Sequence, residues 1–378
     1  MLFKDIIGHH RIKQQLISTV KDGRVSHAQL FYSKPGSTSF SLALAYAQYI
    51  NCLNPSAEDS CGTCSNCKQF LSGNYPDLHY SFPVITNDKI KKPTSDDYRK
   101  EWLDYIKRCS GIPALHDWLS YLDAGNKQGI MTVSESSSLN RKSSLKSYTG
   151  GKKVFLIWLP ELFHPSAANK LLKTIEEPEG DTLFLLISEN LEKVLQTITS
   201  RCQKLFIPLY RPTEVATWLE QQGTDTNTAE LTSLLAEGNL NEALRIAEDS
   251  ARFHEYAVLF RDWMRACLRA RVQEIFTFVD ALSKQSRETI KEALSFYIQT
   301  IELSLKSHVT ASPIEHPLFK KASFDLNKFA PFVHAQNAGP IHRQLSEAHR
   351  DIARNANPKI VLSDCSFKMS RYLHIKAS

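Results

Sequence analysis

The sequence predicts a parallel α/β fold for residues 1–208, followed by helical regions. Short apolar runs alternate there with helical patterns, and these runs are AQLFY, DLHYSFPV, KVFLIWL, TLFLLIS and KLFIPL. Continuous Val, Ile, Leu and Phe bounded by polar turns are typical of strands that are buried on both faces. After Pro208 the strand patterns give way to helical ones. We therefore expect the α/β part to end near that proline.

The remainder of the chain is expected to be helical in two parts, a small unit at 209–250 and a C-terminal domain at 251–378. An apolar stripe with three- and four-residue spacing marks one helix of the second part: Ile290, Leu294, Tyr297, Ile301 and Leu305. Such a stripe indicates packing either against the helix's own core or against a partner. Residues 359–373 are expected to add only a final turn or two.

Residues 86–130 are expected to be an insertion. TNDKIKKPTSDDYRKEW is densely charged, and YRKEWLDYIKRC has the pattern of a surface helix. The following stretch SESSSLNRKSSLKS, at 134–147, holds seven serines and taken alone predicts a loop.

Composition excludes some classes of protein. The chain of 378 residues carries 46 basic and 40 acidic residues, a mild excess of positive charge that is compatible with nucleic acid nearby but is also ordinary for solubility. The longest apolar runs are too short to span a bilayer, and the first residues lack a signal-peptide pattern. We therefore expect a cytoplasmic protein without a membrane segment.

Four of the eight cysteines form a compact cluster with the spacing C-x8-C-x2-C-x2-C. Four thiolates this close in sequence can close a tetrahedral site, and zinc is its commonest occupant. An iron–sulfur cluster is the alternative, because the spacing C-x2-C-x2-C also occurs in proteins that bind such clusters. The position of the fourth cysteine upstream and the absence of a Cys-Pro pair at the end of the run favour zinc instead. Free thiols or disulfides are disfavoured without secretory features. The prediction is a structural zinc on the cluster's four cysteines, Cys52, Cys61, Cys64 and Cys67.

A segment after the first predicted strand has the outline of a phosphate-binding loop. In the register G-x-x-x-x-G-K-[ST], the sequence SKPGSTSF places Ser33 and Thr38 at the glycine positions, with Gly36 between them. Ser39 stands where the lysine belongs, and Phe40 stands where a magnesium-binding hydroxyl belongs. Taken in isolation, this segment is more simply interpreted as an ordinary polar turn between a strand and a helix.

Several motifs together resemble the delta-prime family of subunits from the bacterial DNA polymerase III clamp loader, which belongs to the AAA+ class. The resemblance covers nearly the whole chain. The sequence departs from the family's pattern at 86–130 and in the serine-rich stretch. It rests on the motifs FKDIIGHHRIKQQL, SHAQLFY, LALAYAQYINC, NYPDLHYSFPV, YTGGKKVFLIW, AANKLLKTIEEP, LFLLISEN, TSRCQKLFIPL and NPKIVLSDCSFKMSRYL.

The resemblance implies a domain plan and a fold. It implies an AAA+ domain at 1–208 with a zinc module at 52–67, a helical lid at 209–250 and a helical collar for oligomerisation at 251–378. For the serine-rich stretch it implies a helix after a short strand, against the local prediction of a loop.

The resemblance also implies that the nucleotide site is inactive. An active AAA+ protein places Asp-Glu after the strand KVFLI, to hold Mg²⁺ and orient water. This sequence has Trp158 and Leu159 there, and Glu161 lies off the needed position. A sensor position is implied at 188–190. Without the lysine, the hydroxyl and both carboxylates, we expect no ATP hydrolysis and no bound ATP.

One arginine carries the remaining functional prediction. In clamp loaders the arginine of a Ser-Arg-Cys triplet, here Ser200, Arg201 and Cys202, reaches the ATP of the adjacent subunit. Without this resemblance, a surface arginine in an ion pair is the simpler reading.

The implied function is a non-hydrolysing subunit of a hetero-pentameric ring. The ring would contain motor subunits and a delta subunit, and would load a sliding clamp on primed DNA. The alternatives are an active AAA+ ATPase, such as the motor subunit or a helicase loader, and a zinc-dependent nucleic-acid-binding module.

Overall fold

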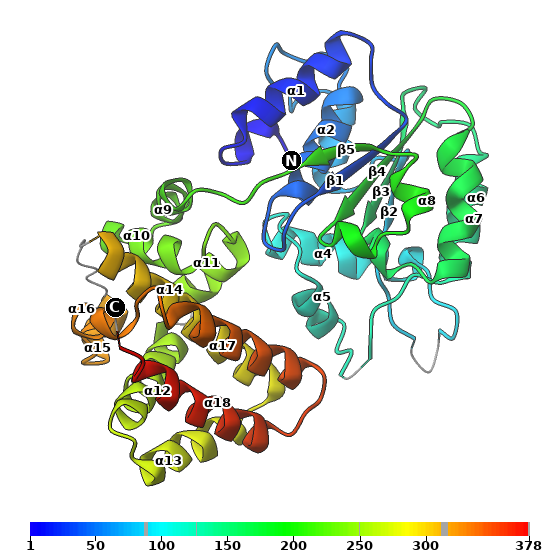
Figure 1. The fold of residues 1–378 in the computed structure, drawn as a ribbon. Coiled ribbons are helices and arrows are strands. Elements are labelled where there is room, and N and C mark those ends of the chain that lie inside the picture. Colours follow the sequence, from blue (N-terminus) through cyan, green and yellow to red (C-terminus); the bar gives the residue numbers. More distant parts are fainter. Residues whose placement is uncertain (87–89, 126, 249, 311–316, 377–378) are drawn as a thin grey trace. The chain divides into compact units, whose positions relative to one another are not determined.

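The computed structural model describes residues 1–378 except 87–89, 126, 249, 311–316 and 377–378, so that part of the predicted insertion lies outside the described residues. Two compact units result (Figure 1). The first comprises Met1–Glu214 with Gly238–Asn241, and the second comprises Val215–Glu237 with Glu242–Ser378. The finer division into an AAA+ domain, a lid and a collar stays a prediction.

A five-stranded sheet forms the centre of the first unit, and all its neighbouring strands are parallel, in the order β2-β3-β4-β1-β5. The five predicted strands are confirmed. Their bounds are β1 Ala28–Tyr32, β2 Leu78–Ser81, β3 Lys153–Trp158, β4 Thr182–Ser188 and β5 Gln203–Phe206. Because every strand runs the same way, the turns that follow the strands gather at one edge of the sheet, here called the carboxyl edge. The turns that precede the strands lie at the amino edge.

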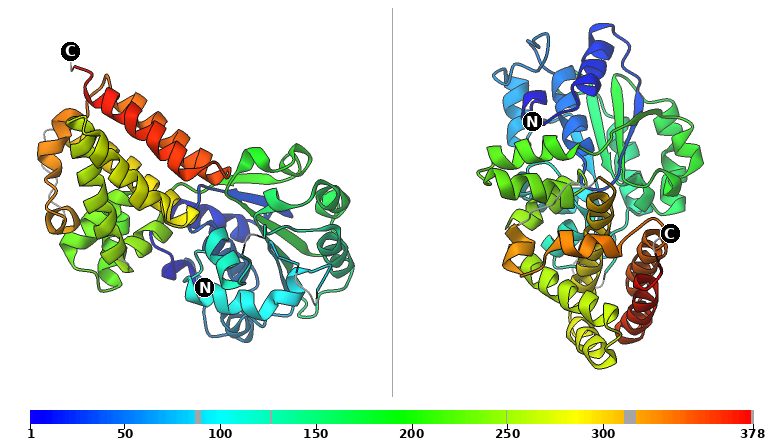
Figure 2. Two further views of the ribbon diagram at one scale, coloured as in Figure 1. Left: turned by 90° about the horizontal axis from the view of Figure 1, so that it is seen from below. Right: turned by 60° about the vertical axis from the view of Figure 1, so that its left-hand side comes forward.

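Helices cover both faces of this sheet (Figures 1 and 2). On one face Leu156 and Leu185 share a core with α1 (His10–Lys21) and α2 (Ser39–Ile50). On the other face Phe155 and Phe184 share a core with α7 (Pro165–Glu176). Both faces are thus buried, which explains why the strands lack polar alternation.

Short elements complete the first unit, and the predicted surface helix in the insertion is among them. Their bounds are η1 Phe3–Asp5, α3 Ser65–Ser72, η2 Ser95–Tyr98, α4 Arg99–Arg108, α5 Leu115–Tyr121, η3 Pro160–Leu162, η4 Leu191–Lys193 and α8 Gln196–Thr199. Helix α4 differs from the prediction because it is not confined to the surface. Its Trp102 is fully buried and Tyr105 nearly so.

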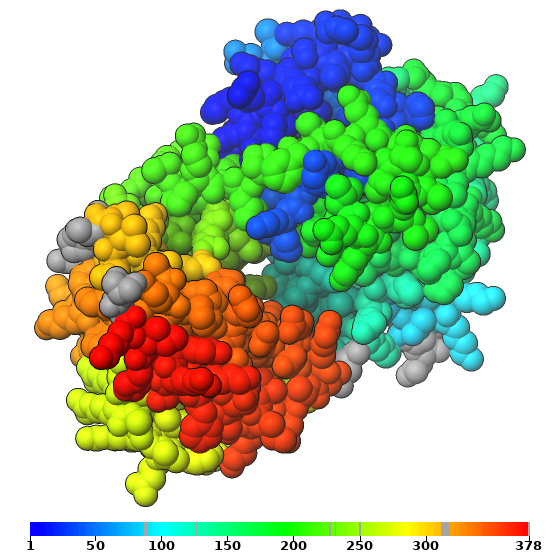
Figure 3. All heavy atoms as spheres, in the orientation of Figure 1, coloured from blue at the N-terminus to red at the C-terminus, as the bar shows by residue number. Residues whose placement is uncertain are grey.

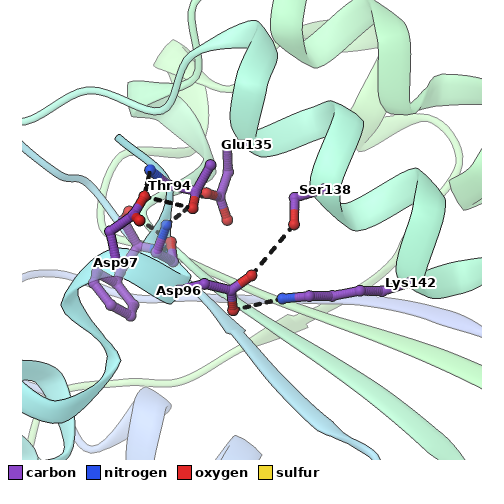
Figure 4. A network of polar contacts seen from close by, with 8 residues as sticks. Thr94, Asp96, Asp97, Glu135, Ser138 and Lys142 are labelled. Carbon is purple, nitrogen blue, oxygen red and sulfur yellow. Dashed lines mark hydrogen bonds and ion pairs between the residues drawn. The ribbon is translucent and has the colours of Figure 1, made fainter. Parts of the chain in front are cut away.

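The serine-rich stretch is a helix, α6 (Val133–Ser143), so the local prediction of a loop is wrong. Two of its serines donate to groups outside the helix: Ser136 Oγ to the Ala167 carbonyl (2.8 Å), and Ser138 Oγ to Asp96 (3.3 Å). Figure 4 shows Asp96 reaching both Ser138 and Lys142, whose Nζ lies 2.6 Å from Asp96 Oδ1. These contacts outweigh the local hydrogen bonding that favours serine in loops.

The second unit is helical in its described residues. The helices from residue 212 onward are α9 Pro212–Gln221, α10 Thr226–Leu235, α11 Leu240–Glu248, α12 Ser250–Leu268, α13 Val272–Ser283, α14 Arg287–Thr310, α15 Pro317–Lys321, α16 Leu326–Phe329, η5 Ala330–Phe332, α17 Ala338–Ala353 and α18 Pro358–Leu373. The predicted stripe lies on α14, and Ile290, Leu294 and Tyr297 are buried in the unit's own core. Residues 359–373 form most of a full helix, α18, at the surface of this unit (Figure 3), and not the turn or two expected.

Candidate functional site

The loop between β1 and α2 is closed by its own side chains. Ser33 Oγ and Ser37 Oγ each donate to Ser39 Oγ over 3.1 Å, and Ser37 Oγ accepts from the Ser39 backbone N–H. Ser33, Ser37, Thr38 and Ser39 are all buried. A phosphate-binding loop must leave its donors open to the anion. Here the hydroxyl groups are satisfied within the chain.

Residues far along the chain cover the same loop. The Leu240 N–H donates to the Gly36 carbonyl (3.0 Å), and Thr38 Oγ1 hydrogen-bonds the Tyr210 hydroxyl. Gly36 has φ +81°, and a Cβ there would lie 1.8 Å from Asn239 Oδ1, so the Asn239 side chain rests directly on the glycine. The two segments therefore pack directly against the loop at Gly36 and Thr38.

Aromatic side chains occupy the positions that would hold magnesium. Phe40, at the start of α2, makes an edge contact with Trp102 (5.7 Å between ring centroids), and Trp158 at the end of β3 lies 5.1 Å from the same ring. Leu159 is also buried. Trp102 comes from the 86–130 segment, where Phe82 and Trp118 pack against it. That segment therefore packs an aromatic cluster against the two residues at the predicted magnesium positions.

Glu161, the acidic residue that follows β3, accepts hydrogen bonds from backbone N–H groups. Its Oε1 accepts hydrogen bonds from the N–H groups of Glu189 (2.9 Å) and Asn190 (3.0 Å), at the predicted sensor position. Ser188 is fully buried, and its Oγ accepts from the Asn190 N–H (3.1 Å). Burial raises the pKa of Glu161, and burial together with the Glu161 charge raises the pKa of Glu189 to about 8. By accepting these two hydrogen bonds, the Glu161 side chain stabilises the turn after β4.

The four clustered cysteines converge in space. Their sulfur atoms all lie within 4.8 Å of one another, and the Cys61 and Cys67 sulfurs are 3.9 Å apart. Because Zn–S bonds are about 2.3 Å, the edges of a tetrahedral S₄ site are about 3.8 Å. The donor set and its spacing therefore fit zinc with only small adjustments.

Backbone groups around the cluster favour thiolates. The N–H groups of Cys61, Cys64 and Cys67 donate to the sulfurs of Cys52, Cys61 and Cys64, over 3.2–3.4 Å. The donors from Cys64 and Thr63 lower the pKa of Cys61 to about 6. Burial raises the pKa of Cys67 instead, and a bound cation would offset that cost. Four protein ligands leave no open position, so such a metal would be structural.

Arg201 lies at the amino edge of the sheet, just before β5. Ser200 is the C-cap of α8, and Cys202 is buried. Arg201 Nε donates to Glu176 Oε2 (2.8 Å), Nη1 donates to the Thr197 carbonyl (3.0 Å), and about 32% of the side chain is exposed. Arg201 thus forms the ion pair that the simpler interpretation predicts, but this pair leaves the guanidinium partly exposed.

Arg201 and the loop after β1 occupy opposite edges of the sheet. The loop follows β1 at the carboxyl edge, whereas Arg201 precedes β5, which pairs with β1 in parallel. Strands of four or five residues separate the two edges by roughly 13–16 Å. Arg201 is therefore placed away from its own loop, at the other end of the strands.

Comparison with known families decides the membership of the chain. The model of the family described as DNA polymerase III, delta subunit, matches residues 8–210, more than half of the sequence. The chain belongs to this family. The expectation of a delta-prime subunit of the clamp loader is confirmed by this match and by the curated relatives.

Three relatives illustrate the similarity. Subunit delta' of DNA polymerase III from Bacillus subtilis is 30% identical over 239 residues, covering 63% of this chain and 59% of that protein. Subunit delta' from Escherichia coli is 28% identical over 234 residues, covering 62% and 58%. Subunit tau/gamma from Haemophilus influenzae is 28% identical over 225 residues, covering 60% and 26%. The matches thus span less than two thirds of these relatives' lengths.

The sequence indicated the loop, the cysteines and Arg201 as candidates, but it did not indicate the residues that contact them. Asn239 and Tyr210 contact the loop, Trp102 packs against Phe40, and Glu176 pairs with Arg201. The length of α4 and its aromatic spacing were the available signal for Trp102, since Trp102, Tyr105 and Ile106 share one helical face. Within the described residues, no helix combines the length and apolar character that crossing a bilayer requires.

Proposed function

We propose that this protein is a non-hydrolysing subunit of a bacterial clamp loader that supplies Arg201 to the ATP of a neighbouring motor subunit. The observation that carries the proposal is the placement of the arginine. It stands partly exposed at the amino edge, while the chain's own loop is filled at the opposite edge. Such an arrangement suits a group that acts across an interface.

The chemistry assigned to Arg201 is electrostatic. Guanidinium is permanently charged and presents a planar fork of N–H groups to phosphate oxygens. Phosphoryl transfer depends on positioning and on stabilising charge in the transition state, and an arginine supplied by another protein raises the rate by about 10³–10⁵. Within the proposal, Ser200 ends α8 so that the arginine projects from the helix terminus.

The proposal includes the assembly and its task. The chain would join motor subunits and a delta subunit in a hetero-pentameric ring that places a sliding clamp on primed DNA in the cytoplasm. The helical second unit would join a collar with the other subunits. Its surface exposes Ile360, Phe276 and Phe367, the last two with ring centroids 6.1 Å apart, on α13 and α18. Exposed apolar side chains of this kind favour contact with other helices.

Structural zinc is the proposed metal. Its four thiolates would join the loop after α2 to the start of α3, and the same region holds the beginning of the chain. Asp59 accepts hydrogen bonds from the N–H groups of Phe3 (3.0 Å) and Lys4 (2.9 Å). The metal would therefore stabilise the packing of η1 and α2, with no part in ATP chemistry.

An active ATPase remains the second candidate because the tau/gamma relative is about as similar as the delta' relatives. The residues oppose it, since Ser39, Trp158 and Leu159 replace the lysine and both carboxylates. The purified chain should accordingly show no MgATP turnover.

The test is an ATPase assay on the assembled complex with Arg201→Ala. We expect DNA-stimulated hydrolysis to fall while the complex still elutes intact from a sizing column. Unchanged hydrolysis in the variant complex would reject the arginine's role, and turnover by the isolated chain would favour the second candidate.

A further inference from the structure

The salt bridge between Arg201 and Glu176 leaves most N–H donors at the Nη end of the guanidinium without a hydrogen bond in the described part of the chain. Glu176 uses the Nε–H (2.8 Å), and the Thr197 carbonyl uses one N–H of Nη1 (3.0 Å). An arginine has five N–H donors, so both donors of Nη2 and one of Nη1 have no bond within the described residues. The open donors form the end of the fork that binds two oxygens at once.

Glu176 occupies a position where an acid is locally unfavourable. It is the last residue of α7, where the partial negative charge of the helix dipole disfavours a carboxylate. The neighbouring Glu177 adds a second negative charge at the same terminus. Arg201 Nε lies within hydrogen-bond distance of Glu176, so the ion pair offsets the unfavourable free energy of an acid at this helix terminus.

Open surface lies next to the pair. Glu176 also lines a hollow of about 420 Å³ at the amino edge, together with Ser26, His27, Lys152 and Asp181. Lys152 is paired with Asp181 there, so that its charge is already compensated. Arg201, which is paired with the lining residue Glu176, is also partly exposed and keeps N–H donors on its Nη atoms that are unused within the described residues.

We propose that Glu176 is a positioning residue for Arg201: its carboxylate fixes the Nε edge so that the Nη end points outward, toward a phosphate on a neighbouring subunit. Thr197 and Glu176 hold two different nitrogens, which restricts rotation of the planar group about the last side-chain bonds. This inference rests on the proposed function, because it assumes that Arg201 acts on a neighbour's ATP.

The expected effect is modest because the pair is exposed. Exposed ion pairs contribute little, and typical coupling corresponds to a factor of about two to five in a population or rate. Glu176→Ala should therefore lower kcat for DNA-stimulated ATP hydrolysis by the complex about two- to fivefold. KM for ATP should change little, because the motor subunit supplies the nucleotide's own binding loop.

The experiment compares five variants in the assembled complex, the first of which is Glu176→Ala. Glu176→Gln keeps a hydrogen-bond acceptor and should recover part of the kcat lost in Glu176→Ala. Glu177→Ala removes the same charge from the adjacent exposed position and should leave kcat unchanged. Arg201→Ala alone, and the double variant Glu176→Ala with Arg201→Ala, should have equal kcat, since a residue that acts only through Arg201 has nothing to add once it is gone.

The outcomes separate the two proposals. If Arg201→Ala lowers kcat while Glu176→Ala leaves it unchanged or raises it, the positioning role is wrong and the trans arginine stands. A further fall in the double variant, or an equal loss in Glu177→Ala, would also overturn the positioning role. If Arg201→Ala has no effect, the proposed function itself fails.

Discussion

Replacing Trp102 with alanine should destabilise the first unit by about 3 kcal/mol. The side chain is fully buried and contacts Phe40, Phe82, Trp118 and Trp158. Removing a large buried aromatic ring costs about 3–5 kcal/mol. Trp102 Nε1 has no hydrogen-bond partner within the described residues, so its removal also relieves an unsatisfied polar group worth about 1 kcal/mol or more. The net loss should fall near the lower end of the range.

A chain of two units need not unfold in one step, so a single free energy of unfolding is not defined for it. Native-state hydrogen exchange avoids this problem, because it measures the loss of stability at individual amides of the first unit. Amides of β3 should exchange roughly a hundredfold faster in Trp102→Ala, the factor that corresponds to about 3 kcal/mol. Lys100→Ala, at an exposed position of the same helix, is the matched control and should change exchange little. A loss below about 1 kcal/mol at β3 would show that the 86–130 segment does not share the core of the sheet.

Further predictions concern the metal, the loop, the acidic turn and the assembly. The purified chain should contain about one zinc ion per molecule, and Cys67→Ser should release it, as metal analysis would show. Ser39→Lys alone should restore no ATP binding in equilibrium dialysis, because Asn239 and Phe40 still fill the site. Because the pKa of Glu189 is raised in the folded protein, the folded state binds this proton more tightly than the unfolded chain does, and the free energy of unfolding should fall as pH rises from about 4.5 to 8. The slope should be at most about 1.4 kcal/mol per pH unit. Glu189→Gln should flatten it in urea titrations. Phe367→Asp should weaken assembly in sizing experiments without changing the helix content of the isolated chain.

The sheet could be predicted because each strand carries its own signal. Five apolar runs suffice when both faces of a parallel sheet are buried. The cysteine cluster is equally local, since all four ligands lie within one short stretch. By contrast, the serines of α6 favour a loop until their partners are known, and the Ala167 carbonyl and Asp96 are far away in sequence.

The closure of the loop could not be predicted for the same reason. Sequence identifies which residues a nucleotide site lacks, but not which side chains fill the space. Asn239 reaches Gly36 across two hundred residues, and Trp102 comes from a segment whose charge pattern indicates a surface. The partner of Arg201 is likewise non-local, because Glu176 ends a different helix.

Single-turnover hydrolysis in the assembled complex tests the central claim most directly. With Arg201→Ala, the motor site that adjoins this subunit should still bind ATP but release phosphate far more slowly, while the remaining motor sites keep their rate. Phosphate release at the normal rate from every site would contradict the account.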